Sequence, residues 1–207
     1  MGVRFFNIEQ NSDDWYDLRM GRLTNSNLGT IMAHYGKPFG QPARRYAVEI
    51  ALERITGAEQ GRSFYNSAME RGHTLEPLAR KKYEVEYFCT VTNGGFFAAD
   101  EYGGSPDGLV GDDGVIEIKS VIPVTHYDTL MRGTYDPAYH WQIVGHIEIT
   151  GREWCDFISY CPEFPEDKSL FVHRVTRDEV SEDIEKLRIR RSQFLELVNT
   201  IQKEIEK

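Results

Sequence analysis

The segment from residue 104 to residue 121 constrains the fold of this chain more than any other part of the sequence. Two short apolar runs, Leu109–Gly111 and Val115–Val121, flank Asp112-Asp113-Gly114. An Asp-Gly pair between two such runs signals a tight turn, so the segment predicts a β-hairpin.

Strand geometry assigns the polar and apolar side chains of this hairpin to opposite faces. Successive side chains of a strand alternate, so Glu117 and Lys119 share one face while Ile116 and Ile118 fill the core on the other. If residues 112–114 form a three-residue loop, Asp107 lies opposite Lys119 and on the face of Glu117. A two-residue loop would turn Asp107 to the other face. If Asp107 and Glu117 act together they must share a face, so we predict an odd-length loop, or a bulge that restores the alternation.

Two carboxylates and a lysine at one hairpin can support metal-dependent hydrolysis. Asp107 and Glu117 offer the hard oxygen ligands that suit Mg²⁺ or Mn²⁺. A bound divalent ion activates water and neutralises charge on a phosphate, and Lys119 can orient the water or stabilise the transition state. The alternative is a solvated hairpin, which Glu-x-Lys alone would favour because alternating charge is common on exposed strands.

The rest of the chain alternates between helical and strand patterns, which predicts a mixed α/β fold. Ser12 begins the first helix as an N-cap, and Gly57 and Pro77 mark a stop and a new turn or kink. Helices are predicted at residues 12–21, from Thr24 to Ser26 onward, and at 42–57, 66–88, 123–132, 137–150 and 178–206. Strands are predicted at residues 89–93, 96–99, 109–111, 115–121, 154–160 and 170–175.

Length and charge set further bounds. The chain has 207 residues and a formal net charge of −9, with eight basic and fifteen acidic side chains between residues 61 and 160. This length suits one domain, residues 1–207. A negative chain argues against a generic nucleic-acid-binding protein but not against an enzyme whose metal supplies positive charge. Without a long apolar run or a secretory pattern, and with three unclustered cysteines, we expect no membrane span and a cytoplasmic location.

Several motifs together resemble the lambda-exonuclease (YqaJ-type viral recombinase) family of the PD-(D/E)xK nuclease superfamily. Residues 105–108, Ser-Pro-Asp-Gly, and residues 116–119, Ile-Glu-Ile-Lys, match the superfamily pattern, with Glu76 as the upstream helical acid. Residues 15–26 resemble the family motif W-x-x-x-R-x-G-x-[IL]-T-x-S, and residues 139–142 resemble Y-x-x-Q. The four motifs occur in family order.

This resemblance implies a restriction-endonuclease-like core, with a central mixed β-sheet flanked by helices and a long C-terminal helix. It implies an exonuclease that degrades one strand of linear double-stranded DNA from the 5′ end, releases 5′ mononucleotides and leaves a 3′ overhang for a single-strand-annealing recombinase. Mg²⁺, replaceable by Mn²⁺, would act with two ions per site, and the chain would assemble as a toroidal homotrimer.

The resemblance also implies a role for individual residues. The implied metal ligands are Glu76, Asp107, Glu117 and the carbonyl of Ile118; the implied catalytic residues are Asp107, Glu117, Lys119 and Gln142; and the implied 5′-phosphate ligands are Arg19, Ser26 and Ser105. Without the motif, Arg19 would be read as a surface arginine paired with Asp13 or Asp14. A guanidinium suits a terminal phosphate because it can bind two oxygens at once.

Other readings remain open at this point. The same core would serve a structure-specific or restriction-type endonuclease, and a non-enzymatic DNA-binding module would require a decayed site, against which the acid and lysine set argues. His126, His140 and His146 lack zinc-site spacing and are read as stacked or core side chains. The basic run 80–82 is read as a solvated helix face, with contact to the DNA backbone as the alternative.

Overall fold

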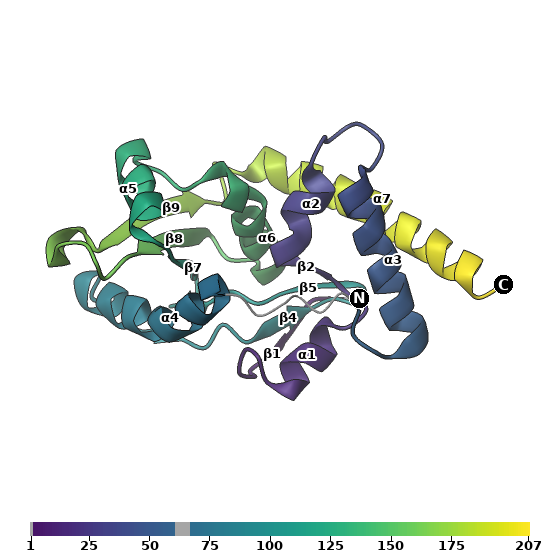
Figure 1. Cartoon of the computed structure of the whole chain (residues 1–207), viewed down its shortest axis with the longest axis horizontal. Coiled ribbons are helices and arrows are strands. Elements are labelled where there is room, and N and C mark those ends of the chain that lie inside the picture. The colour runs from purple at the N-terminus through teal and green to yellow at the C-terminus, as the bar shows by residue number, and fades with distance from the viewer. Residues whose placement is uncertain (1, 61–66) are drawn as a thin grey trace.

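The computed structural model describes the backbone of residues 2–60 and 67–207, which form helices packed around two β-sheets (Figure 1). The helices are α1 (Asp13–Arg19), α2 (Leu28–Met32), α3 (Gln41–Thr56), α4 (Ser67–Glu86), α5 (Pro123–Arg132), α6 (His140–Thr150) and α7 (Ser181–Ile205), with 3-10 turns at Asn25–Asn27, Pro137–Tyr139 and Glu166–Lys168. The strands are β1 (Arg4–Phe6), β2 (Leu23–Thr24), β3 (Val91–Thr92), β4 (Phe96–Ala98), β5 (Tyr102–Gly104), β6 (Gly108–Val110), β7 (Gly114–Ser120), β8 (Trp154–Tyr160) and β9 (Leu170–Thr176).

The predicted mixed α/β fold is confirmed, with the strands divided between two mixed sheets. The larger sheet has the order β3-β6-β7-β8-β9, in which only the β7–β8 pair is parallel. The smaller sheet has the order β1-β4-β5-β2, and its β2–β5 pair is parallel. A parallel pair requires a crossover connection, and α5 and α6 supply it between β7 and β8.

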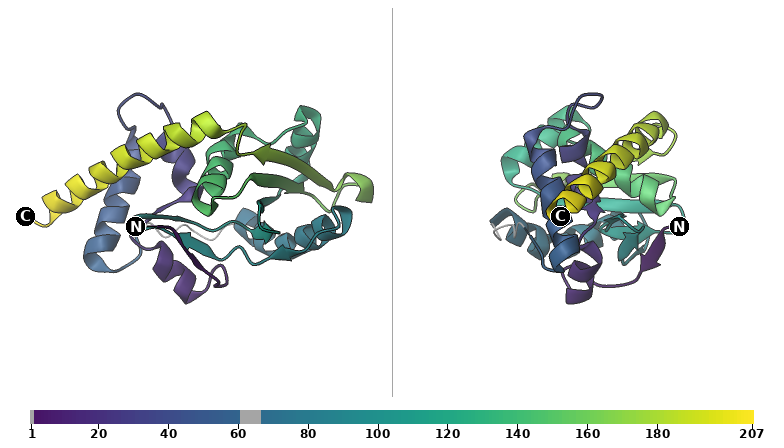
Figure 2. Two further views of the ribbon diagram at one scale, coloured as in Figure 1. Left: turned by 180° about the vertical axis from the view of Figure 1, so that it is seen from behind. Right: turned by 90° about the vertical axis from the view of Figure 1, so that its right-hand side faces the viewer.

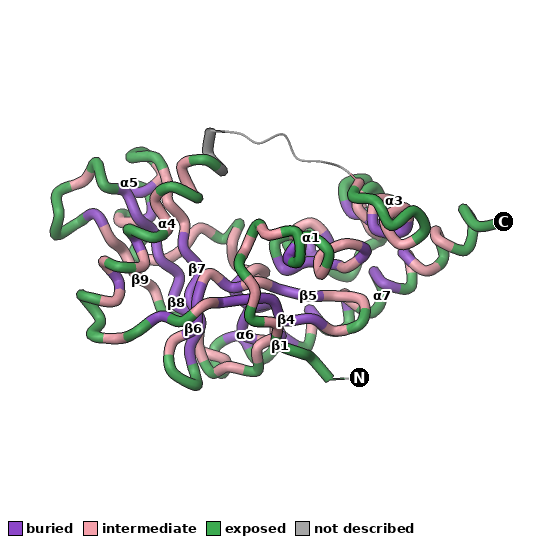
Figure 3. The backbone as a smooth tube through the Cα atoms, turned by 90° about the horizontal axis from the view of Figure 1, so that it is seen from below, coloured by how far each residue is buried: buried purple, intermediate pink, exposed green. Residues whose placement is uncertain are grey.

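Strand β7 is buried on both faces, so Glu117 in its centre must lie inside the protein. Ile116 and Ile118 pack with Tyr83 of α4 on one face, while Val115 belongs to the core that includes Ile143 of α6 on the other. Figure 3 shows β7 and β8 as largely buried segments within the molecule. The predicted alternation of β7 is confirmed, but Glu117 emerges toward α6 with only 1% of its surface exposed.

The long C-terminal helix is also confirmed. Helix α7 packs its buried stripe, including Leu187, Phe194 and Val198, into the larger core, and it lies against α3. Its C-terminal end extends away from the rest of the chain (Figure 2). No helix among the described residues combines the length and the apolar character needed to cross a lipid bilayer.

The predicted helix ends at Ser12 and Gly57 are confirmed, because each of these residues acts on the backbone next to it. The Ser12 side chain accepts a hydrogen bond from the Trp15 amide at 3.3 Å and begins α1. Gly57 ends α3 in the left-handed conformation, at φ 63°. Pro77 does not end its helix, because α4 continues through it from Ser67 to Glu86. Strands β1, β2 and β5 were not predicted.

Candidate active site

The β6–β7 hairpin has the predicted parity but a different register. Gly108 pairs with Ile116 and Val110 pairs with Gly114, so the loop is residues 111–113. The loop is three residues long, as predicted, but it begins one residue earlier than expected. Asp107 therefore aligns with Glu117, and the prediction that it opposes Lys119 was wrong.

Two glycines explain the shifted register. Gly111 takes the left-handed backbone, with φ 53°, at the start of the loop. Gly114 lies within β7 beneath the indole of Trp154, where a Cβ atom would come within 2.2 Å of the ring. Gly114 is therefore a strand residue that Trp154 covers, and the turn is formed by the residues before it.

Asp107 is held at the start of β6 by contacts on both its carboxylate and its main chain. One carboxylate oxygen, Oδ2, accepts a hydrogen bond from the Ile118 amide at 2.6 Å, and Oδ1 accepts a weaker one from Gln10 at 3.4 Å. The Asp107 carbonyl accepts a hydrogen bond from Arg80 of α4. Arg80 is therefore part of the site, and the reading of its run as a solvated face was wrong at this residue.

Glu117 is the most enclosed of the acids, and both of its oxygens have partners. Oε1 lies 2.5 Å from the Lys119 ammonium, and Oε2 lies 2.8 Å from Nε2 of His146 on α6. Both Glu117 and His146 are almost completely buried. A buried carboxylate needs such partners, because removing its charge from water is costly.

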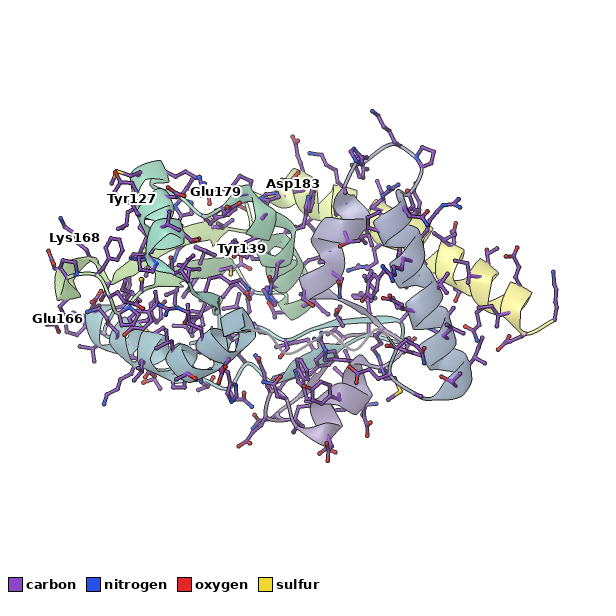
Figure 4. The ribbon with its side chains drawn as sticks, viewed as in Figure 1. Tyr127, Tyr139, Glu166, Lys168, Glu179 and Asp183 are labelled. Atoms are coloured by element: carbon purple, nitrogen blue, oxygen red, sulfur yellow. The ribbon has the colours of Figure 1, made fainter. Side chains whose placement is uncertain are left out.

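Lys119 connects the strand to the motif that precedes and begins α6. Its ammonium donates a hydrogen bond to Oε1 of Gln142 at 3.4 Å and lies 5.0 Å from the centre of the Tyr139 ring. Tyr139 comes from the turn before α6 (Figure 4), and its neighbour His140 is held by Asp183 at the start of α7. The Y-x-x-Q motif thus positions two side chains around Lys119.

The acids of the site affect one another's ionisation. Burial raises the pKa of Asp107 well above its ordinary value, and the charges of Glu117 and Glu76 raise it further. Burial would also raise the pKa of Glu117, but the Lys119 ammonium and the His146 hydrogen bond bring it to about 2. Burial would lower the pKa of Lys119, but the carboxylates of Glu117 and Asp107 raise it.

Glu76 faces the same cluster from α4. Its carboxylate lies 3.7 Å from Arg80, one helical turn later. Burial is the largest influence on the pKa of Glu76 and raises it, Arg80 opposes that rise, and the charge of Glu117 adds to it. Glu76 also lines a cavity of about 610 Å³ between α4 and the segment of Gln10 and Asn11. It is therefore close enough to the strand acids to affect them through its charge.

The donor set fits a hard divalent cation. Across the described residues, no three His, Cys, Asp or Glu side chains form a complete metal-binding group. Mg²⁺ does not require one, because it keeps several waters and usually takes one or two protein carboxylates. Asp107 and Glu117 would supply those, and Glu76 acts on the same cluster through its charge; the role of the Ile118 carbonyl stays a prediction. A cation between them would offset the repulsion that raises the pKa of Asp107.

The predicted phosphate ligands lie around Trp15. The Arg19 guanidinium stacks 4.1 Å from the Trp15 ring and reaches the Ser26 hydroxyl at 3.5 Å. The Trp15 indole donates a hydrogen bond to the Ser105 hydroxyl at 3.1 Å. Ser105 in turn donates to the Gly95 carbonyl at 2.5 Å. Arg19 and Ser26 are thus brought into direct contact, and Ser105 joins them through Trp15.

Arg19 has a property that a surface ion pair would not give it. Neither Asp13 nor Asp14 forms an ion pair with Arg19, so that alternative reading was wrong. Burial lowers the pKa of Arg19 below its ordinary value, although the charges of Glu53 and Glu59 oppose this. A partly buried guanidinium that stacks on an aromatic ring is a suitable partner for a phosphate group.

Comparison with known proteins identifies the family of this chain. Residues 14–153 match the model of the YqaJ-like viral recombinase domain, and this segment contains all the predicted site residues: Arg19, Ser26, Glu76, Ser105, Asp107, Glu117, Ile118, Lys119 and Gln142. The chain belongs to the YqaJ-like viral recombinase domain family. No curated protein matches this chain in sequence.

Solved structures extend the likeness of this YqaJ-like chain beyond the matched domain. An alkaline exonuclease (LHK-Exo) from Laribacter hongkongensis is 33% identical, with a TM-score of 0.85 over 94% of this chain and 96% of that chain. The same values hold for its complex with dAMP. A phage-related exonuclease from Haemophilus somnus 129PT shares the fold, at 15% identity and a TM-score of 0.73 over 91% of this chain and 98% of that chain.

Sequence reasoning missed several residues of the site in this YqaJ-like chain. His146 was read as a core or stacked histidine, yet its ring contacts Glu117 directly. Its position four residues after Gln142 on one helix was an available signal, because that spacing places two side chains on one face. Gln10 and Asn25 had no such signal, because each reaches the site from a distant segment.

Proposed function

We propose that this chain is a metal-dependent nuclease that digests one strand of linear double-stranded DNA in the 5′-to-3′ direction. It would release 5′ mononucleotides and leave a 3′ overhang for a strand-annealing recombinase. Family membership and the likeness to an alkaline exonuclease support the nuclease role. The observation that carries the finer proposal is the link from Arg19 and Ser26, through Trp15 and Ser105, to the cluster of Asp107, Glu117 and Lys119.

The residues of the acidic cluster would hold the metal ion and stabilise charge at the scissile phosphate. Mg²⁺, held by Asp107 and Glu117, would activate water and neutralise charge on the scissile phosphate. Lys119 lies beside Glu117, where its ammonium can orient the attacking water and stabilise the negative charge that develops. Gln142 accepts a hydrogen bond from Lys119 and thereby orients the ammonium.

End recognition would depend on the terminal phosphate. A 5′ phosphomonoester carries more charge than an internal diester and has an additional free oxygen. Arg19 can bind two of its oxygens, and the hydroxyl of Ser26 lies beside the guanidinium. Ser105 already donates its proton to Gly95, so it would contact the phosphate only after that hydrogen bond is exchanged.

A ring assembly would compensate for the acidic surface. Non-specific affinity for DNA arises mainly from neutralising phosphates, and a chain of net charge −9 is poorly suited to this as an open monomer. A closed homotrimer would retain DNA by topology with few contacts. Light scattering at micromolar concentration should give a trimer mass, and a monomer that still digests DNA processively would contradict this.

The decisive experiment compares DNA ends. Linear duplex with a labelled 5′-phosphorylated strand is incubated with protein and Mg²⁺, beside a covalently closed circle and an EDTA control. We expect mononucleotides from the phosphorylated linear DNA only, and none with EDTA. Cutting of the closed circle would instead favour a restriction-type endonuclease on the same core.

A further inference from the structure

A buried chain of hydrogen bonds connects the end-recognition segment to the metal side of the site. Asn25, which lies between Thr24 and Ser26, contacts Nδ1 of His146 through its side-chain nitrogen at 3.2 Å. The other ring nitrogen of His146 lies 2.8 Å from Oε2 of Glu117. The exposed fractions are 5% for Asn25, 0% for His146 and 1% for Glu117, so water does not compete for these contacts.

Each hydrogen bond in this series is donated in the same direction, from Asn25 to His146 and from His146 to Glu117. The Asn25 amide nitrogen donates to Nδ1 of His146, so the ring proton resides on Nε2 and is donated to Glu117. Oε2 of Glu117 is therefore held by His146, while Oε1 faces Lys119 at 2.5 Å. The imidazole fixes the plane of a carboxylate that we assign to metal binding.

The packing around Asn25 leaves its side chain little freedom. A Cβ atom on Gly104 of β5 would approach the Asn25 side chain to 2.3 Å, and one on Gly145 of α6 would approach it to 3.0 Å. The two glycines thus make room for an asparagine that is wedged between a strand and a helix. An enclosed amide of this kind can fix the tautomer of the histidine it faces.

We propose that Asn25 and His146 are positioning residues that orient Glu117 for the metal. Through Asn25 they also join the Thr24–Ser26 segment to the metal site. The inference rests on the proposed function, because it assumes that Glu117 binds Mg²⁺. Partners that orient a metal ligand typically change metal affinity about 10- to 100-fold when removed.

Two substitutions of His146, each of which keeps a polar atom near only one of the two ring nitrogens, test the positioning role without DNA. His146→Gln places an amide nitrogen near the position of Nε2 and can keep the hydrogen bond to Glu117. His146→Asn keeps a polar atom only near Nδ1, facing Asn25, and loses that bond. His126→Asn is the matched control, because His126 is equally buried but contacts Ser159 and the Lys168 carbonyl.

The readout is Mn²⁺ affinity by isothermal titration, together with thermal unfolding of each metal-free variant. We expect Kd to rise about 10-fold or more in His146→Asn, to stay within about threefold in His146→Gln, and to be unchanged in His126→Asn. On DNA, kcat should follow Mn²⁺ affinity across the variants while KM stays constant. An unchanged Kd in His146→Asn, or equal losses in all three variants, would overturn the inference.

Three further outcomes are also informative. If His146→Asn does not fold, Asn25→Ala replaces it, and an unchanged Kd in that variant would equally overturn the inference. If the wild-type protein binds Mn²⁺ and digests DNA while these variants bind normally, only the positioning role fails. If the wild-type protein binds no Mn²⁺, the proposed function fails first.

Discussion

The metal side of the candidate site and its phosphate side are built in opposite ways. On the metal side, Glu117 is buried and both of its oxygens are satisfied, by Lys119 and by His146. On the phosphate side, Arg19 is held over Trp15 and contacts the Ser26 hydroxyl, and the charges of Glu53 and Glu59 only partly offset the effect of its burial. The acidic side has its charges paired within the protein, and the basic side is suited to an external anion.

This difference indicates how the two sides should respond to mutation. Removing one partner from a paired, buried cluster leaves the other uncompensated, which costs more than the pair contributed. Arg19 is held by a ring contact and one long hydrogen bond, so removing it should cost the fold less and should mainly affect what it binds. We therefore expect changes on the metal side to abolish turnover and changes on the phosphate side to alter selectivity.

The largest effect should come from Asp107→Asn, which removes one proposed metal ligand. We expect turnover on 5′-phosphorylated linear duplex to fall by about 10³-fold or more, because lost metal stabilisation is worth several kcal/mol. Mn²⁺ binding by isothermal titration should weaken in parallel. Asp112→Asn, in the exposed loop of the same hairpin, is the control and should keep wild-type activity. Unchanged Mn²⁺ affinity in Asp107→Asn would remove Asp107 from the ligand set.

Lys119→Met should follow, with turnover reduced about 10²- to 10³-fold, the usual cost of losing one group that stabilises the transition state. Methionine keeps the length of the side chain, so stacking beside Tyr139 is retained while the charge is lost. Initial rates at saturating DNA measure the effect, and Lys82→Met, which removes a surface partner of Glu86, is the control. Retention of more than a tenth of the activity would argue against a catalytic role.

Arg19→Ala tests the phosphate side of the candidate site. Hydrogen bonds to charged groups contribute about 1.5–3 kcal/mol, so the preference for 5′-phosphate over 5′-hydroxyl duplex should fall about 10- to 100-fold. Mn²⁺ affinity and thermal stability should stay near wild-type values. Arg45→Ala, which alters an exposed arginine paired with Glu49, should keep the preference. An undiminished preference in Arg19→Ala would remove Arg19 from the pocket.

Stability without metal should depend on pH through Asp107. Its pKa is raised in the folded protein, so above the unfolded value of about 4 the folded state retains a proton that the unfolded chain releases. The free energy of unfolding therefore falls as pH rises above about 4. Asp107→Asn removes this loss, so its free energy of unfolding relative to wild type should increase between pH 4 and pH 7.

Urea unfolding in EDTA at the two pH values measures this change. Glu117 acts in the opposite sense, because its pKa is lowered to about 2, and its contribution is lost only as pH falls below about 4. It therefore lies outside the chosen window. A difference between variant and wild type that does not change with pH would contradict the assignment.

Trp15→Phe should have the smallest effect and would refine the link between the two sides. Phenylalanine keeps a ring beneath Arg19 but removes the hydrogen bond to Ser105. A hydrogen bond of this kind contributes about 1 kcal/mol, so the phosphate preference should fall about fivefold. The same end-preference assay measures it. If Trp15→Phe loses as much of the 5′-phosphate preference as Arg19→Ala does, the hydrogen bond from Trp15 to Ser105 is more important for phosphate binding than we expect.

Elements whose causes are local could be predicted from the order of amino acids alone. Strand alternation placed Glu117 and Lys119 on one face, and the requirement for matching faces predicted an odd-length loop, although at residues 112–114 and not at 111–113. Ser12 and Gly57 marked helix ends because each acts on its own backbone. The motifs around these positions, taken in order, indicated the family that the comparisons then established.

Only the tertiary structure decided which distant groups share the buried volume. The hairpin register shifted because the Trp154 ring, from the neighbouring strand, covers Gly114. His146 became a partner of Glu117, and Asn25 a partner of His146, across 121 residues of sequence, because β5 and α6 enclose them together. Periodicity reports which face a side chain occupies, but a contact between distant segments depends on how those faces pack.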